Sequence, residues 1–195
     1  MNYLGQPLAD FLDSVASGEP APGGGAVAAV AVALAAGLSG MSARLSADHL
    51  VDATALAERA DHLRQRVAPL AQEDATAYGH VLSAYRAPDD GGDPKVRRER
   101  IRTALSGAAD VPLAVAEAGA EVVEVAARLA REGNPNLRGD AVAAALLAEA
   151  GVRAAAVLVE INTTAGEISD DRVERVGQCV TRAVEAAGGI AEGDG

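Results

Sequence analysis

Aromatic residues are scarce in this 195-residue chain, which contains three tyrosines, one phenylalanine and no tryptophan. Proteins that read single-stranded nucleic acids stack the bases on aromatic side chains, so a reader of that kind is disfavoured. Basic residues are also few, because 17 lysines and arginines stand against 28 acidic residues, for a formal net charge of −11. A field of that sign repels nucleic acids and anionic membrane surfaces, and we expect neither as a partner.

Cysteine occurs once, which excludes a disulfide framework and a thiolate zinc cluster. The three histidines show no ligand spacing with one another, so we predict no metal site. The first residues carry no basic stretch of the kind that opens a secretory signal. These features together predict a protein of the reducing cytoplasm.

Alanine makes up about a quarter of the chain, and alanine favours helices over strands. No segment alternates apolar and polar residues with the period of a strand. The sequence therefore predicts an all-α bundle of about six helices, several of them long and kinked, in one domain over residues 1–189 with a loose tail at 190–195. The expected helices cover residues 7–16, 26–46, 52–84, 95–131, 140–161 and 170–187, with kinks at Pro69 and Pro112.

One segment, residues 26–43, is long enough and uncharged enough to span a membrane. It consists mostly of alanine, glycine and serine, however, and this composition favours a helix buried in a soluble assembly. Its small residues Ala33, Gly37 and Gly40 allow another helix to approach closely. Such a helix is too apolar to stay exposed, so we expect a homodimer.

The strongest local motif is the run from Pro20 to Gly25, two prolines followed by three glycines, ahead of the apolar helix. Glycines let a backbone approach a ligand closely, and a helix N-terminus attracts a carboxylate or phosphate. Pro22, Gly23, Gly24 and Gly25 are therefore candidate binding residues. A flexible linker or an N-terminal cap would explain the same residues.

Asp74 interrupts an apolar stripe that includes Leu63, Val67 and Leu70 on one side and Val81 on the other. A carboxylate in that register faces the core or an interface, where burial tends to raise its pKa. Such a group is a candidate acid or base. If Pro69 rotates the register, Asp74 is instead an ordinary solvated residue.

Two further polar sites adjoin apolar helices. Asn134 and Asn136 lie in a turn with Pro135, and Asp140 follows at the start of the fifth expected helix. The amides of this turn suit a cleft, although an N-cap role alone explains Asp140. Asn162 stands near the end of the same helix, where a C-cap role is the alternative.

These segments together resemble the cyclodeaminase/cyclohydrolase family, the C-terminal domain of formiminotransferase-cyclodeaminase and its stand-alone bacterial relatives. The resemblance extends from about Leu8 to Asn162, and its most specific elements are Pro-Gly-Gly-Gly at 22–25 and Gly-Asn-Pro-Asn at 133–136. The other matching segments are Phe11-Leu12, Ala16-Ser17, Met41 to Ser46, Asp74 with Ala77-Tyr78, Ala84 to Pro88, Val111 to Leu113, Asp140 and Ile161-Asn162.

The resemblance implies an all-helical, dimeric enzyme that acts on tetrahydrofolate one-carbon units without a metal or redox cofactor. One family reaction closes 5-formimidoyltetrahydrofolate to 5,10-methenyltetrahydrofolate with release of ammonia, and the other opens the methenyl compound with water. We expect Asp74 to transfer the proton and Asp140 to stabilise the cation or contact the pterin. The resemblance further implies that Pro22 to Gly25, Met41, Asn134, Asn136 and Asn162 bind the substrate.

The chain departs from the family pattern at several polar positions. Ala26 and Gly139 stand where the family usually has serine, and Leu158 stands where an asparagine is typical. Residues 46–49 contain no lysine, although the family has a basic cluster there after Met41. These departures leave a second hypothesis open, a non-catalytic helical dimer that keeps the scaffold as an interaction or regulatory protein.

Overall fold

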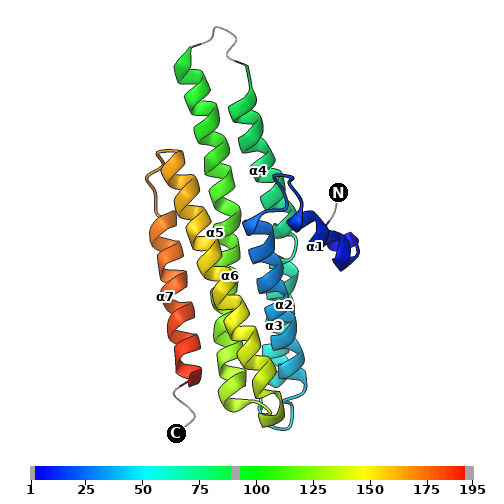
Figure 1. Cartoon of the computed structure of the whole chain (residues 1–195). Coiled ribbons are helices and arrows are strands. Elements are labelled where there is room, and N and C mark those ends of the chain that lie inside the picture. The colour runs from blue at the N-terminus through cyan, green and yellow to red at the C-terminus, as the bar shows by residue number, and fades with distance from the viewer. Residues whose placement is uncertain (1–2, 89–92, 192–195) are drawn as a thin grey trace.

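The computed structural model describes residues 3–88 and 93–191, and these residues form an elongated all-α bundle (Figure 1). The described part of the chain contains no strand, which confirms the all-α prediction. Short 3₁₀ helices, η1 (Tyr3–Gly5) and η2 (Pro135–Leu137), precede the first and the sixth α-helix. The α-helices are α1 (Leu8–Ala16), α2 (Gly24–Arg44), α3 (Ala53–Val67), α4 (Leu70–Arg86), α5 (Pro94–Glu132), α6 (Arg138–Ala165) and α7 (Arg172–Ala191).

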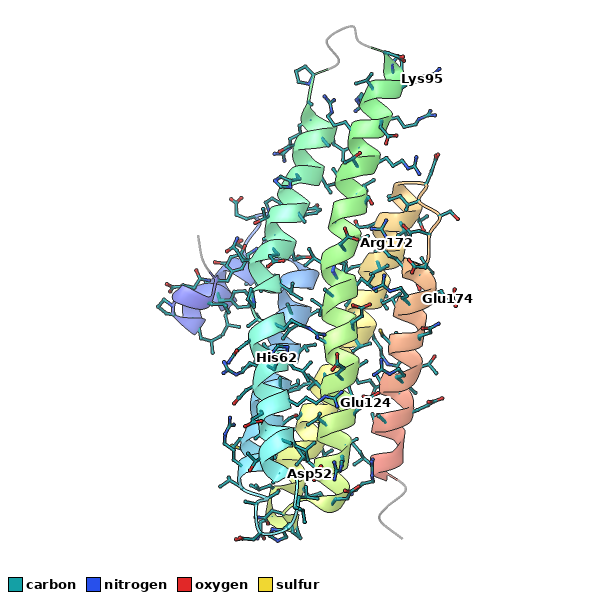
Figure 2. All side chains as sticks on the ribbon, turned by 180° about the vertical axis from the view of Figure 1, so that it is seen from behind. Asp52, His62, Lys95, Glu124, Arg172 and Glu174 are labelled. Carbon is teal, nitrogen blue, oxygen red and sulfur yellow. The ribbon has the colours of Figure 1, made fainter. Side chains whose placement is uncertain are left out.

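The long helices form two layers. Helices α2 and α6 lie side by side in front in Figure 1, and the view from behind shows α3 and α4 stacked end to end beside α5 and α7 (Figure 2). The core between the layers is built mainly from alanine and valine, with Val32, Val122 and Val152 almost completely buried. Because these side chains are small, the helices pack closely without aromatic residues.

The two interior prolines have different outcomes. The expected single helix over 52–84 is two helices, because Pro69 has no N–H to continue the helical hydrogen bonds. Pro112 instead lies within the continuous helix α5. Its missing N–H leaves the Ala108 carbonyl, four residues earlier, without a helical partner, and Asn162 Nδ2 donates to that oxygen at 2.9 Å. A side chain from α6 thus stabilises α5 at its proline.

Helix α1 confirms the helix expected over residues 7–16. Most of its apolar side is uncovered, however, because only Phe11 is buried, while Leu8 and Leu12 are 67% and 58% exposed. The helix projects from the bundle beside α2 and α4 (Figure 1), and the stripe has no cover within the described chain. At the other terminus, α7 runs past the expected stop at Gly188 and Gly189 because Ile190 packs into the core. The rest of the predicted tail, 192–195, lies outside the described residues, as do residues 89–92 before α5.

Two helical segments, Gly24–Arg44 and Pro135–Ala165, are long and apolar enough to cross a membrane by length and composition. In the bundle, 56% and 44% of their apolar windows are buried, so each helix buries one face and leaves the other uncovered. The uncovered face, called here the apolar face, consists of Val27, Leu34 and Met41 on α2 and Leu147, Val157 and Ile161 on α6. The opposite side of the bundle instead carries ion pairs, such as Arg66 with Glu121 and Arg182 with Glu124.

Two glycines that the sequence reading did not single out set the spacing of the layers. A Cβ on Gly151 would lie 2.6 Å from Val32 Cγ2 and 3.2 Å from the Ala28 carbonyl oxygen. A Cβ on Gly119 would lie 2.6 Å from Val152 Cγ2. Among the glycines predicted to allow close approach, Gly40 does so, because its Cβ would lie 3.6 Å from Ala60 on α3.

We therefore expect Gly151→Ala to lower the free energy of unfolding by about 1–3 kcal/mol, because the added methyl group must push α2 away from α6. Gly177→Ala on α7 is the matched control, since a Cβ there meets no atom within 4 Å. That variant should be neutral or stabilising by up to about 1 kcal/mol. Urea denaturation followed by circular dichroism measures both, and equal stabilities would refute the packing argument.

Candidate active site

The triple-glycine motif and Asp74 meet in the structure. Asp74 on α4 places its carboxyl group directly against Gly25 at the start of α2, so that a Cβ on Gly25 would come within 2.6 Å of all three carboxyl atoms. Pro22 is buried and follows a cis peptide bond, and Gly23, the residue immediately before α2, has an extended conformation. The absence of a side chain at Gly25 is therefore what lets a carboxylate from another helix reach the N-terminus of α2.

Two opposing effects act on the Asp74 carboxyl group. Burial among apolar helices penalises its charged form, while the backbone N–H of Ala26 donates to it and favours that form. Burial is the larger effect, and it raises the pKa of Asp74 above the ordinary range of an aspartate. Helix α2 has no side-chain cap of its own, so Asp74 supplies one of its free N–H groups with an acceptor. Asp74 therefore faces other helices of the bundle, as its position in the apolar stripe predicts.

Tyr3 is a neighbour of Asp74 that the sequence reading missed. Burial and the charge of Asp74 together raise the pKa of its phenol. The ring stacks edge-on against Phe11, with 5.6 Å between the ring centres. No sequence pattern links Tyr3 to Asp74, because the contact depends on how the N-terminal segment folds back over the bundle.

The asparagine turn lies at the opposite end of α2. Asn134 Nδ2 donates to the Leu45 carbonyl at 3.0 Å, and the Asn134 N–H donates to Ser46 Oγ at 2.9 Å. Within the turn, Asn134 Oδ1 accepts from the Asn136 N–H at 3.0 Å. Gly133 is required here, because a Cβ would lie 2.6 Å from the Leu129 carbonyl oxygen. These contacts fasten the turn to the C-terminal end of α2, and the Asn136 side chain remains exposed.

The remaining predicted residues divide between the two ends. Met41 belongs to the last turns of α2, near the asparagine turn, and is 37% exposed. Asp140 is half-buried in the first turn of α6, which begins at Arg138. Asp140 is therefore not the N-cap of this helix. Asn162 lies inside α6 rather than at its C-cap, and its amide N–H₂ group is held by Ala108.

Helix α2 separates these two groups of residues. Its 21 residues span about 30 Å, at 1.5 Å per residue. Gly25 and Asp74 lie at one end, whereas Met41, Asn134 and Asp140 lie at or near the other. The residues that the resemblance assigns to the substrate, together with Asp74 and Asp140, therefore do not line one cleft within a single chain. Among the described residues, no group of three or more His, Cys, Asp and Glu side chains is arranged to hold a metal ion.

We expect Gly25→Ala to lower turnover roughly 10²-fold, the loss that an ångström-scale displacement of a catalytic group causes. The new methyl group must displace the Asp74 carboxyl group, which is able to swing toward solvent, so the unfolding midpoint should change little. Gly79→Ala on the same helix as Asp74 is the control, because a Cβ there meets nothing within 4 Å. Steady-state kinetics on both variants checks the contact, and an active Gly25→Ala protein would contradict it.

Comparisons with known proteins identify the family of the chain. A family model described as formiminotransferase-cyclodeaminase matches residues 7–179. A methenyltetrahydrofolate cyclohydrolase from Methylorubrum extorquens is 35% identical over 164 residues, which cover 80% of this chain and 79% of that protein. A formimidoyltransferase-cyclodeaminase from Sus scrofa is 35% identical over 178 residues, and these cover 87% of this chain but only 32% of the longer relative.

A solved structure gives the same result for the fold. The crystal structure of formiminotetrahydrofolate cyclodeaminase from Thermotoga maritima superposes with a TM-score of 0.78 and 29% sequence identity, over 96% of this chain and 98% of that one. The match extends over nearly the full length of both chains. The chain therefore belongs to the formiminotransferase-cyclodeaminase family.

Proposed function

We propose that this protein is a tetrahydrofolate enzyme that closes or opens the methenyl bridge between N5 and N10 of the folate. The observation that carries the proposal is the half-buried Asp74 carboxyl group, which lies against Gly25 and accepts from the Ala26 N–H. Burial raises its pKa above that of an ordinary aspartate, which suits a group that takes up and releases a proton. The family membership and the similarity to a cyclohydrolase and a cyclodeaminase support the same substrate class.

One carboxylate can carry the proton in either reaction. In ring closure, N10 attacks the carbon of the formimidinium group, and the carboxylate of Asp74 carries the N10 proton to the departing nitrogen, which leaves as ammonia. In ring opening, the carboxylate takes a proton from the attacking water and delivers it to N5 as the C–N5 bond breaks. The second proton of the water is released when the formyl carbonyl forms. In both reactions the carbon under attack already carries positive charge, and the protein has only to move protons between nitrogen and oxygen atoms. We therefore expect no metal or redox cofactor to be needed.

Two of the departures from the family pattern, at positions 26 and 139, leave the Asp74 carboxyl group and its contact in place. At position 26 the contact to Asp74 is made by the backbone N–H, which alanine supplies as well as serine does. At Gly139 a Cβ would meet no atom within 4 Å, so the missing side chain borders open space. Both observations favour an enzyme over a scaffold that has lost its site.

We further propose that the protein forms a homodimer in which each copy completes the site of the other. The apolar face is continuous over α2 and α6, and Leu34, its most exposed residue, is 60% exposed at the middle of α2. Two copies packed antiparallel through this face, about a two-fold axis near Leu34, bring the C-terminal end of one α2 to the N-terminal end of the other. The asparagine turn and Asp140 of one copy then lie near Gly25 and Asp74 of the second copy, where Asp140 can stabilise the cation.

The activity is tested by absorbance at the methenyl band, with a chelator present throughout. Purified protein should accelerate either the formation of methenyltetrahydrofolate from the formimidoyl compound or its decay to 10-formyltetrahydrofolate. The direction that is accelerated decides between a cyclodeaminase and a cyclohydrolase. Rates equal to the uncatalysed reactions with both compounds would refute the proposed function and leave the non-catalytic dimer.

A further inference from the structure

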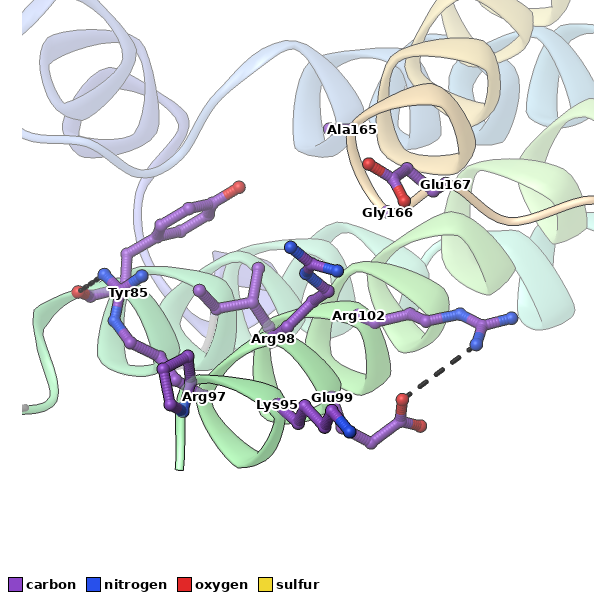
Figure 3. Close-up of a pocket in the computed structure, with 11 residues that line it drawn as sticks. Tyr85, Lys95, Arg97, Arg98, Glu99, Arg102, Ala165, Gly166 and Glu167 are labelled. Carbon is purple, nitrogen blue, oxygen red and sulfur yellow. Dashed lines mark hydrogen bonds and ion pairs between the residues drawn. The ribbon is translucent and has the colours of Figure 1, made fainter. Parts of the chain in front are cut away.

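All four aromatic residues of the chain lie either on the N-terminal segment, residues 3–16, or on α4, the helix that carries Asp74. Tyr78 and Tyr85 on α4 are 42% and 46% exposed. Tyr85 extends into a cavity of about 650 Å³ at the far end of that helix (Figure 3). Tyr3 is half-buried and Phe11 is buried, and both belong to the N-terminal segment. This second pair is therefore the aromatic cluster that is partly enclosed by the fold.

Tyr3 joins the N-terminal segment to the bundle. Its side chain packs against the main hydrophobic core, which includes Ala26 at the start of α2 and Ala71 on α4. Phe11, the one buried residue of α1, does not belong to that core. Its ring meets the Tyr3 ring edge-on, with 5.6 Å between the ring centres and 68° between the planes. The Tyr3 ring therefore lies between α1 and the core, at the place where α1 projects beside α2 and α4 (Figure 1).

The Asp74 carboxyl group accepts from the Ala26 N–H and forms no ion pair with any described residue. Helix α2 carries no charged residue before Arg44, which lies at its other end. The titratable residues on the adjoining elements are Asp10 and Asp13 on α1, Glu73 and His80 on α4, and Asp110 on α5, where Asp110 is paired with Arg172. The protonation of Asp74 is therefore governed by burial and by the Ala26 N–H, and not by an ion pair.

Tyr3 contributes to that burial. It lies close enough to Asp74 for the charge of the carboxylate to raise the pKa of the phenol, in addition to the effect of its own burial. No hydrogen bond joins the two side chains among the described residues. A phenol that donated to the carboxylate would favour the charged form, whereas a ring that only displaces water disfavours it. Tyr3 therefore acts on Asp74 through the bulk of its ring.

We infer that Tyr3 is a positioning residue of the reaction, whose ring covers the Asp74 carboxyl group and keeps bulk water away from it. The inference rests on the proposed function, because it concerns the same carboxyl group. Tyr3 lies outside residues 7–179, which match the family model, so the family resemblance assigns it no role. With water excluded, the carboxylate accepts a proton more readily and passes it to the folate instead of the solvent.

The test compares Tyr3→Ala, which removes the ring, with Tyr3→Phe, which keeps it. Tyr3→Ala should lower kcat about tenfold at neutral pH, because an uncovered carboxylate is a weaker base. The acid limb of its pH profile should move about one pH unit toward acid, because the exposed group returns toward an ordinary aspartate. Tyr3→Phe should keep the kcat and the acid limb of the wild type.

Leu8→Ala is the matched control, since it truncates a 67% exposed side chain on the same segment, and it should behave as the wild type does. Tyr3→Ala protein with the acid limb of the wild type would overturn the inference, even if its kcat were lower, because a purely structural role does not move that limb. Tyr3→Phe protein as impaired as Tyr3→Ala would also overturn it, because the hydroxyl group and not the ring would then be responsible.

A second measurement does not depend on folate turnover. In protein labelled with carbon-13, the Asp74 carboxyl signal is identified by its absence from Asp74→Asn and is followed as the pH changes. It should titrate at a lower pH in Tyr3→Ala than in the wild type, Tyr3→Phe and Leu8→Ala. Equal titration in all four proteins would contradict the cover. If the titrations differ as expected but the wild type converts neither folate, the proposed function is refuted, and the cover of Asp74 by Tyr3 is not.

Discussion

Asp74→Asn is expected to lower kcat by about 10²–10⁴-fold, the contribution of a positioned acid or base. The amide has nearly the same shape as the carboxyl group and can still accept from the Ala26 N–H, so the fold at the start of α2 is kept. It cannot carry a proton between the folate nitrogens, however. Asp74→Glu should not restore activity, because the longer side chain moves the carboxyl group away from its place against Gly25. Steady-state kinetics at the methenyl band measures both variants.

The pH dependence of the same variant gives a second readout. Burial raises the pKa of Asp74 in the folded protein. The contribution of this group to stability is therefore fully present below the pKa of the unfolded chain and is lost as pH rises through the raised pKa of the folded state. Asp74→Asn, which has no charge to bury, should be more stable than the wild type at pH 7 and equal to it in acid. Turnover by the wild type should decline as pH falls through the raised pKa, because the reaction begins with the carboxylate.

Glu73→Gln is the matched control, since it removes a neighbouring exposed carboxylate on the same helix. It should retain the activity, the pH profile and the stability of the wild type. Asp74→Asn protein that turns over at the wild-type rate, or that loses stability at pH 7, would contradict the role and the environment assigned to Asp74.

Leu34→Glu is expected to convert the dimer to monomers and to lower turnover at least tenfold. Leu34 lies at the centre of the apolar face, where each buried leucine stabilises an interface by about 2 kcal/mol and a buried charge opposes it. The loss of activity follows because no residue of the asparagine turn reaches Asp74 within one chain. Light scattering coupled to gel filtration measures the mass, and the methenyl assay measures turnover.

The control for this variant is Val173→Glu, an equally charged change at a 43% exposed valine on α7, outside the apolar face. It should leave both the mass and the turnover unchanged. Wild-type protein that is monomeric and fully active would show that the second copy is not needed. Wild-type protein that is monomeric and partitions into lipid vesicles would show that the apolar face contacts a membrane.

Much of the fold could be predicted because helix periodicity and breakers are local properties of the sequence. The stripe through Leu63, Val67 and Leu70 places Asp74 correctly, since Pro69 keeps near-helical angles and α4 continues the register of α3. The helix α1 could be predicted in the same way, but what covers its apolar residues could not. Periodicity shows that a face must be covered, but it does not show which element, or which copy of the chain, covers it.

The site could be predicted only in part. Glycines before an apolar helix, and an acid in an apolar stripe, indicated the pair that does meet, Gly25 and Asp74. The distance between that pair and Asn134 depends on the direction and length of α2, and local patterns do not reveal how such a helix positions distant segments. The hydrogen bond from Asn162 to the Ala108 carbonyl oxygen could not be predicted either. That carbonyl lacks a helical partner because of Pro112, which belongs to another helix than Asn162.

The central claim, one reaction site built from two copies, is tested most directly by combining two inactive variants. Asp74→Asn and Asp140→Asn chains carrying different affinity tags are co-expressed, and the mixed dimer is purified through both tags. If each site takes Asp74 from one copy and Asp140 from the other, one of the two sites in the mixed dimer is intact, and about half of wild-type turnover returns. A mixed dimer as inactive as either parent protein would contradict the claim.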